Sequence, residues 1–277
     1  MNLGSIKFSV LMSVYKNDKS DFIRIAIDSI LNQTLMPNQF VIMVDGPVSD
    51  NIKELLIDYS KKNSIIEIHF REKNLGLGLT LREGLNYCKY DYVARMDADD
   101  YSLPYRFEKQ IDYLSKHNDV SIIGSAIKEF SNNINNTESI REVPEINDQI
   151  IEFAKKRNPF NHPSVVFQKD AVISVGSYKD VRNLQDYFLW VDLLLAGYKG
   201  YNIQIPLVYM RADNNLFKRR SGKKYIKIQN DLLKYMKGKK FITKKQYIIS
   251  KFIRTCSGYA PNWLRQWLFK KTLRKKG

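Results

Sequence analysis

The sequence is poor in cysteine and has no long uncharged apolar run. Its 277 residues include two cysteines, Cys88 and Cys256, neither of which has metal-binding spacing around it. This excludes a disulfide framework and a cysteine zinc site, and it favours a reducing compartment. No stretch reaches the roughly 18 apolar residues that a membrane-spanning helix needs. Lys7 interrupts the first apolar run too early for a secretory signal. We therefore expect a cytoplasmic protein, and we expect any association with a membrane to be peripheral.

Acidic residues are scarce at one end of the chain. The net charge is +16, and residues 215–277 hold 20 Lys or Arg against a single acid, Asp231. The 214 residues before them carry 25 bases and 28 acids. With 44% hydrophobic residues, the composition is that of an ordinary globular protein. The sequence thus predicts a near-neutral body over residues 1–214 and a basic helical extension over residues 215–277.

Short apolar runs rich in β-formers alternate with helical patterns in the first half. Strands are predicted at 7–14, 39–44, 65–70 and 92–96. Helices are predicted at 21–32, 51–61 and 79–88, and from Pro104 as the first helical residue. This alternation indicates an α/β fold with a mostly parallel sheet covered on both faces. Further along, 131–139 reads as a polar loop and 185–196 as an apolar helix closed by Gly197.

Polar residues follow three of the predicted strands, where a parallel sheet binds its ligands. The most polar junction is Asp97-Ala98-Asp99-Asp100, which places three carboxylates within four residues. Carboxylates this close repel one another, and a divalent cation would offset that cost. Mg2+ and Mn2+ prefer one or two carboxylates together with substrate phosphates. The alternative is that Asp100 or Ser102 merely caps the helix near Pro104.

Six segments taken together resemble the family 2 glycosyltransferases, which have the GT-A fold. They are SVLMSVYKND (9–18), VDGPVSD (44–50), NLGLGLTLREGL (74–85), YVARMDADDYSLPYRFEKQ (92–110), NPFNHPSVVF (158–167) and LQDYFLWVDLLLAGY (184–198). The resemblance extends over about residues 5–212. It divides the body into a nucleotide-binding half, about 5–100, and an acceptor half, about 101–214. The nearest likeness is to bacterial enzymes that build capsule, O-antigen or exopolysaccharide units.

The resemblance implies an inverting, metal-dependent transfer of a sugar from a nucleotide donor, with UDP-sugar expected, to a hydroxyl of a lipid-linked or polysaccharide acceptor. It implies Mn2+ or Mg2+ bound by Asp97 and Asp99, with His162 as a further ligand or as a contact to the diphosphate or acceptor. A purely structural His162 is the alternative. The residues implied in the nucleotide pocket are Ser13, Tyr15, Asp45, Asn74, Gly76, Arg82 and Asp97.

Two positions depart from the family pattern. Val44 stands where a first acid is usual, which leaves Asp45 alone before Gly46, and Arg82 stands where asparagine is common. Asp45 is expected to accept a hydrogen bond from the base, although Asp45-Gly46 is also a turn pair. Arg82 is equally well explained as a solvated helix residue.

Asp186 matches the family's catalytic base. It follows Gln185, which replaces the usual Glu, and large apolar residues surround it in the sequence. Burial among them would raise the proton affinity of a carboxylate. The alternatives are an ordinary helix N-cap, or Asp192 as the base, six residues later and about 120° away around a helix at 100° per residue.

The basic extension mixes lysines with aromatic residues. At its end, Trp263 and Trp267 share a predicted helical face with Leu264 and Leu268. Bases attract anionic lipid while Trp and Leu enter the interface, so we expect residues 215–277 to contact an anionic membrane surface. Packing against the body is the alternative for part of the extension. Two other functions compete: a sugar nucleotidyltransferase, and a basic nucleic-acid-binding protein. We expect no nucleic acid partner, and the sequence leaves the oligomeric state open.

Overall fold

The structure is a computed structural model, and it describes residues 6–131, 134, 137–212 and 222–259. The strands are β1 (Phe8–Val14), β2 (Gln39–Val44), β3 (Ile66–Phe70), β4 (Tyr92–Asp97), β5 (Tyr101–Ser102), β6 (Val120–Phe130), β7 (Thr137–Arg141), β8 (Val166–Gln168) and β9 (Lys199–Arg211). The helices are α1 (Ser20–Leu31), α2 (Asp50–Lys62), α3 (Leu77–Tyr87), α4 (Arg106–Lys116), α5 (Asn147–Ala154), the 3-10 turn η2 (His162–Ser164), α6 (Lys169–Ser174), α7 (Gln185–Leu195), α9 (Gly222–Gly238) and α10 (Lys244–Tyr259).

All of these strands belong to one sheet, in the order β3-β2-β1-β4-β8-β6-β9-β5, with β7 pairing with β6. The first four strands in that order run parallel. The second half is mixed, because β8 pairs antiparallel with β4 and β6, while β6 and β9 run parallel. The carboxyl ends of β1, β2 and β4 therefore lie side by side, as expected from the alternating pattern.

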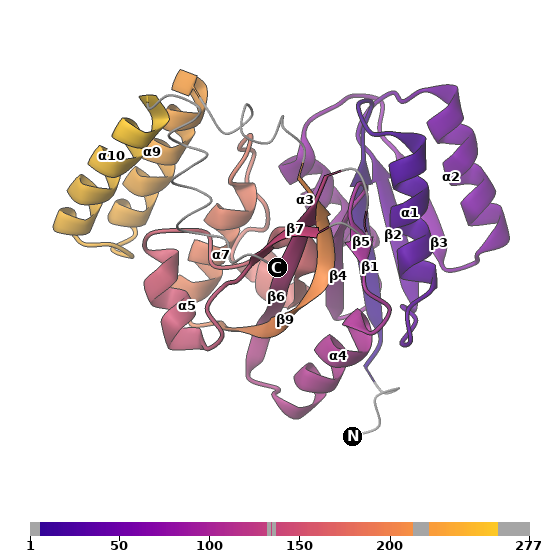
Figure 1. Ribbon diagram of the computed structural model, residues 1–277, viewed down its shortest axis with the longest axis horizontal. Coiled ribbons are helices and arrows are strands. Elements are labelled where there is room, and N and C mark those ends of the chain that lie inside the picture. Colours follow the sequence, from indigo (N-terminus) through magenta and orange to yellow (C-terminus); the bar gives the residue numbers. More distant parts are fainter. Residues whose placement is uncertain (1–5, 132–133, 135–136, 213–221, 260–277) are drawn as a thin grey trace.

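Each face of the sheet is covered by helices, which explains why β2 is buried along its whole length. One face packs against α1, α2 and α4 through the set that includes Val10, Ile42 and Met96. The other packs against α3, α7 and α9 through the set that includes Leu11 and Met43. Figure 1 shows α1 and α2 at one side of the sheet and α9 and α10 at the other. Side chains alternate along a strand, so Ser13, two residues beyond Leu11, lies on the α3 and α7 face.

The sequence placed β1 to β4, α1 to α3 and α7 within two residues, but two other expectations were wrong. Pro104 does not open α4, which begins at Arg106 with Tyr105 as its N-cap residue. The Pro104 carbonyl instead accepts a hydrogen bond from the Thr34 N–H at 2.8 Å, which ties this segment to the end of α1. The polar loop after β6 is also shorter than expected, because β7 begins at Thr137 and pairs with β6.

The basic extension forms a helical pair in its described part. Leu232, Leu233 and Met236 of α9 are fully buried and join the core that contains α7. The alternative of packing against the body therefore holds for α9, and α10 lies alongside it (Figure 1). Among the described residues, no helix is long and apolar enough to cross a membrane. The expected boundary at 214/215 and the Trp263–Trp267 face lie outside the described residues.

Candidate active site

The acidic turn after β4 lies beside the end of β1. Ser13 and Asp97 are register partners on these parallel strands, and both side chains are partly exposed. Asp99 is also partly exposed, whereas Asp100 is 1% exposed. Burial, followed by the charges of Asp99 and Asp97, raises the pKa of Asp100 well above its ordinary value. The turn thus concentrates negative charge at the sheet edge where a ligand is expected.

Asp100 and Ser102 do not cap α4, so the capping alternative was wrong. Asp100 Oδ1 accepts a hydrogen bond from the Arg211 backbone N–H at 2.8 Å, which joins the turn to the end of β9. The Ser102 Oγ accepts a hydrogen bond from Gln33 Nε2 at 3.1 Å. Both side chains connect the turn to its neighbours, which leaves Asp97 and Asp99 as the carboxylates of the turn that face the site.

Arg211, the last residue of β9, contacts this turn and was not among the residues predicted from the sequence. Its Nε donates to the Asp99 carbonyl at 3.1 Å, and its guanidinium lies 3.7 Å from the ring centroid of Phe22 and 4.5 Å from that of Phe130. Burial lowers its pKa, against the opposite effect of Asp99 and Asp100. It therefore holds the acidic turn from behind with a positive charge.

Beneath Asp97 lies a buried chain of polar side chains. Arg95 is fully buried, its Nη2 contacts Asp97 Oδ1, and its Nη1 donates to the Leu11 carbonyl at 2.8 Å. Its Nε donates to His162 Nε2 at 3.3 Å, and that nitrogen also lies 3.0 Å from the Tyr178 hydroxyl. A guanidinium can only donate, so Nε2 accepts and the imidazole is neutral. Burial, then Arg95, lowers the pKa of His162 well below its ordinary value, which agrees with that assignment.

These contacts bear on which side chains could hold a metal ion. His162 Nε2 is engaged by Arg95 and Tyr178, which favours the structural alternative for this histidine. Among the described residues, no group of three or more His, Cys, Asp and Glu is placed to hold a metal. Ligation of a metal ion by Asp97, Asp99 and His162 stays a prediction. The chemistry of Asp97 and Asp99 still fits Mg2+ or Mn2+, which take one or two carboxylates with substrate phosphates.

Asp45 directly follows β2 and is 3% exposed. Its Oδ1 accepts from Leu75 N–H at 2.9 Å and from Arg71 Nη1 at 3.1 Å, and its Oδ2 accepts from Gly76 N–H at 2.9 Å. Arg71 also donates to Thr80 Oγ1 at 2.7 Å, so it joins this loop to α3. In the structure, Asp45 therefore fastens the β3–α3 loop over the end of the sheet. A contact of Asp45 with the base remains a prediction.

The same loop contains the other expected pocket residues. Asn74 is exposed and its Nδ2 donates to the Asp45 carbonyl at 2.9 Å. Gly46 has φ +84°, and a Cβ there would lie 2.5 Å from the Asn74 nitrogen, so only glycine fits this close approach. Gly76 has φ +93° and precedes α3. Arg82 is exposed on α3, as its solvated alternative describes.

Tyr15 stands just past the end of β1 and is partly exposed. Its N–H donates to Asp18 Oδ2 at 2.8 Å, and the Asp18 N–H donates back to the Tyr15 carbonyl at 3.0 Å. This small closed turn fixes the backbone of Tyr15 at the sheet edge, beside Ser13. A contact of the Tyr15 ring with a nucleobase remains a prediction.

Asp186 lies in the first turn of α7 and is partly exposed. It is not the N-cap residue, because Leu184 holds that position at φ +59°, with Asn183 before it at φ +62°. Asn158 Nδ2 donates to Asp186 Oδ2 at 2.5 Å. A hydrogen bond from a neutral side-chain amide orients a carboxylate without neutralising its charge, which suits a proton acceptor. Two left-handed non-glycine residues side by side are strained, and such strain concentrates at functional sites.

Asp186 lies on the same side of the sheet as the acidic turn. The charges of Asp186 and Asp97 both raise the pKa of the buried Tyr178 hydroxyl, after the larger effect of its burial and against Arg95. Helix α3 also touches the start of α7 directly. A Cβ on Gly78 of α3 would lie 2.6 Å from the Lys179 carbonyl and 3.3 Å from the Gln185 Cβ. The acidic turn, the β3–α3 loop and Asp186 therefore border one region.

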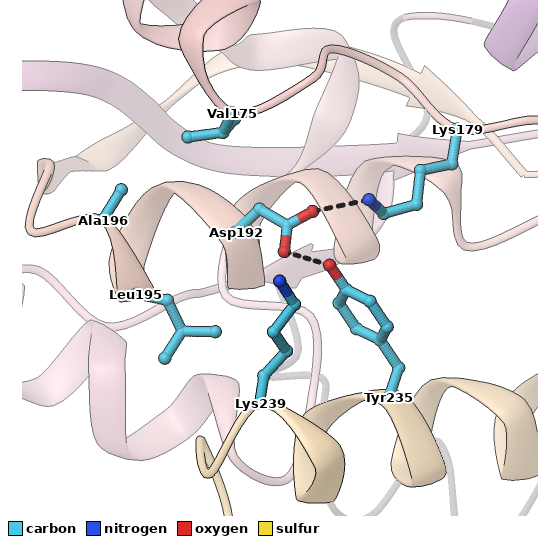
Figure 2. A pocket seen from close by; sticks show the side chains of 7 residues that line it. All are labelled: Val175, Lys179, Asp192, Leu195, Ala196, Tyr235 and Lys239. Atoms are coloured by element: carbon cyan, nitrogen blue, oxygen red, sulfur yellow. Dashed lines mark hydrogen bonds and ion pairs between the residues drawn. The ribbon is translucent and has the colours of Figure 1, made fainter.

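Asp192, the alternative base, faces away from this region. Figure 2 shows its carboxylate between Lys179 and Tyr235, in a pocket of about 390 Å3 at the junction of α7 and α9. Lys179 Nζ lies 2.9 Å from Asp192 Oδ2, and the Tyr235 hydroxyl contacts Oδ1. Burial alone would lower the pKa of Lys179, but the hydrogen bond and charge of Asp192 raise it. Asp192 is thus a structural anchor for α9.

Comparison with known proteins agrees with this geometry. Residues 9–182 match the model of the family described as glycosyl transferase family 2. The amylovoran biosynthesis glycosyltransferase AmsE of Erwinia amylovora is 39% identical, covering 79% of this chain and 81% of the relative. The UDP-Gal:alpha-D-GlcNAc-diphosphoundecaprenol beta-1,3-galactosyltransferase of Escherichia coli is 35% identical and covers 97% of both chains.

A solved structure shares the fold at low sequence identity. The mannosyltransferase PcManGT from Pyrobaculum calidifontis, solved in complex with GDP-Man and Mn2+, superimposes with a TM-score of 0.63 at 13% identity, over 94% of this chain and 72% of its own. The matched family model covers more than half of the chain, and the described strands and helices follow the GT-A arrangement. The chain belongs to glycosyl transferase family 2 and is a GT-A glycosyltransferase.

Proposed function

We propose that the enzyme transfers a sugar, with inversion, from a UDP-sugar to a hydroxyl of a lipid-linked saccharide during synthesis of a bacterial surface polysaccharide. One observation carries the proposal: the Asp97–Asp99 carboxylates and Asp186 border one region at the carboxyl edge of the parallel strands. The relative that covers 97% of this chain has a UDP-linked donor and a diphosphoundecaprenol acceptor in its name, and a match of that length includes most of the basic extension. This supports both substrate classes for the present chain.

In this proposal Asp186 accepts the proton of the acceptor hydroxyl as that oxygen attacks the anomeric carbon from the face opposite the diphosphate. Asn158 holds the carboxylate in orientation through its bond to Oδ2. Ser13 and Tyr15 line the nucleotide pocket, and the loop containing Asn74 and Gly76 closes over it. Asp45 contributes by fixing that loop, and any contact of Asp45 or Arg82 with the nucleotide is part of the proposal.

Asp97 and Asp99 would hold Mn2+ or Mg2+, which when bound neutralises charge on the departing diphosphate. The acidic turn supports this assignment, because it gathers negative charge that a cation would compensate. A solved enzyme of the same fold holds Mn2+ with its nucleotide sugar. Arg95 and Arg211 hold the two ends of this turn from behind, so they act on the geometry of the carboxylates. The basic extension, residues 215–277, would keep the enzyme at the inner face of the cell membrane, where lipid-linked acceptors are held.

The test is a thermal-shift screen of nucleoside diphosphates with Mn2+ and Mg2+, followed by transfer assays with UDP-sugars. Selective stabilisation by UDP with metal, lost in Asp99→Ala, is the expected result. Stabilisation by GDP alone, or by no nucleoside diphosphate, would overturn the donor class. Incubation with a sugar phosphate and a nucleoside triphosphate serves as the control for nucleotidyl transfer, and no nucleotide sugar should form.

A further inference from the structure

An apolar stripe runs along the outer side of α10. It consists of Ile248, Ile249, Phe252 and Ile253, whose exposed fractions are 55%, 48%, 71% and 59%. Spacings of one, four and five residues place these side chains on a single sector of a helix, roughly 140° wide at 100° per residue. Contiguous exposed apolar surface of this kind indicates an interaction site.

The opposite side of α10 is fixed to the rest of the molecule. Tyr247 packs against the core shared by α7 and α9. Arg254 donates through Nη2 to the Lys156 carbonyl at 3.0 Å and through Nη1 to the Gln229 carbonyl of α9 at 3.5 Å. Because these contacts set the rotation of the helix, the apolar stripe points outward from the catalytic body.

Positive charge surrounds the apolar stripe. Residues 222–259 contain 11 Lys or Arg and one acid, Asp231. Lys244 and Lys251 are exposed on α10, about 40° and about 60° from one edge of the stripe, and Lys245 is exposed on the same sector as the stripe. A second copy of this chain on the same face would bring like charges together, which is unfavourable. An anionic lipid surface satisfies both the apolar side chains and the lysines.

We propose that the apolar stripe of α10 inserts into the headgroup region of an anionic phospholipid bilayer, with the lysines of α9 and α10 contacting lipid phosphates. This rests on the proposed function, since an acceptor anchored in lipid gives the enzyme a reason to bind there. The inserted surface is part of the folded enzyme, so insertion fixes the orientation of the catalytic body as well as its distance from the membrane.

Cys256 allows a direct test in the full-length chain. It is exposed eight residues after Ile248, on the same side of α10, whereas Cys88 is 3% exposed, so an environment-sensitive thiol dye labels Cys256 selectively. With vesicles of phosphatidylglycerol and phosphatidylcholine, the dye emission should shift to the blue and gain intensity. Vesicles of phosphatidylcholine alone, or 0.5 M salt, should greatly reduce the change. An unchanged spectrum with anionic vesicles would overturn the proposal.

Substitution of the apolar stripe gives a second measurement. Ile249→Ser with Phe252→Ser should lower vesicle co-sedimentation by about tenfold or more, because partition scales with inserted apolar area. Ile173→Ser is the matched control, since Ile173 is 48% exposed but lies on α6 of the body, and it should bind vesicles like the wild type. If the double variant binds vesicles normally but melts earlier, residues 260–277 cover the stripe. If it instead changes from dimer to monomer by light scattering, the stripe joins two copies. Either result refutes insertion.

The same variants separate this inference from the proposed function. Stabilisation by UDP with metal, and transfer to a water-soluble acceptor analogue, should be equal in the wild type and in Ile249→Ser/Phe252→Ser. Transfer to an acceptor embedded in anionic vesicles should fall in the variant. If the wild type shows neither stabilisation by UDP with metal nor transfer to the soluble acceptor, the result counts against the proposed function. If the wild type and the double variant transfer equally well to the embedded acceptor, the result counts against insertion alone.

Discussion

The two carboxylates of α7 have opposite surroundings although they are six residues apart. Asp186 is partly exposed in the first turn, where a neutral amide orients it beside the region that the acidic turn and the β3–α3 loop border. Asp192 is 8% exposed and is held between the Lys179 ammonium and the Tyr235 hydroxyl. One helix therefore carries the proposed base at its start and an anchor for α9 near its end. The residue type does not distinguish these roles, but the partners do.

The largest expected effect comes from Asp186→Asn. Losing the proton acceptor should lower kcat on the order of 10²–10⁴-fold. Stabilisation by UDP with metal should persist, because the nucleotide side of the site is unchanged. Steady-state kinetics and the thermal shift measure the two properties on one preparation. Turnover near that of the wild type would show that Asp186 is not the base, and the proposed difference in role between Asp186 and Asp192 would no longer hold.

Gly78→Ala places a methyl group of α3 against the segment that leads into α7. The new methyl group would meet the Lys179 carbonyl at 2.6 Å, so α3 and the segment before α7 must move apart. Overpacking of this kind costs about 1–3 kcal/mol of unfolding free energy. Because the contact is next to Gln185, kcat should also fall by more than stability explains. Gly238→Ala, at a position with open space around it, is the control.

Asp192→Asn should lower stability and leave turnover nearly unchanged, which is the opposite of the result expected for Asp186→Asn. Removing the charge opposite Lys179 should destabilise the protein by about 1–3 kcal/mol, as measured by urea unfolding. The value of kcat should stay within a few-fold of the wild type, since Asp192 faces α9. Should this variant be as inactive as Asp186→Asn at full stability, the assignment of the two roles would be reversed.

A last effect concerns His162 and the dependence of stability on pH. Its pKa in the unfolded chain is near 6.5, and burial lowers it in the folded protein. Below pH 6.5 the unfolded chain binds a proton that the folded protein does not, so this group makes stability fall as the pH falls. The slope is about 1.4 kcal/mol per pH unit. His162→Gln should flatten the dependence of the melting temperature on pH between pH 6.5 and 5.

The sequence predicted those features of the fold and the site that depend on residues close together in the chain. The alternation of apolar runs located β1 to β4 and α1 to α3, because strand and helix periods are local properties. The turn Asp97–Asp100 was found for the same reason, since its charges are adjacent in the chain. Pro104 was misplaced because its carbonyl bonds to Thr34, which is 70 residues away.

The partners of the site residues could not be predicted, because they come from distant parts of the chain. Asp45 is held by Arg71, 26 residues later, and Asp100 is held by Arg211, 111 residues later. The sequence does indicate that Arg95 has partners, since a charged residue in the middle of a buried strand requires them. It gives no such indication for Tyr178. The residue types of a site are thus visible in the sequence, whereas their supporting contacts appear only in three dimensions.

The backbone contact at Gly78 limits how the substrate preferences of such an enzyme can evolve. A flexible side chain at a contact can be replaced and the gap refilled, but here the first turn of α3 rests directly on a carbonyl oxygen of the segment leading into α7. The separation between α3 and the proposed base is therefore set by main-chain atoms. Related enzymes could exchange donor and acceptor preferences through their loops while inheriting one fixed spacing, so long as this position carries no side chain.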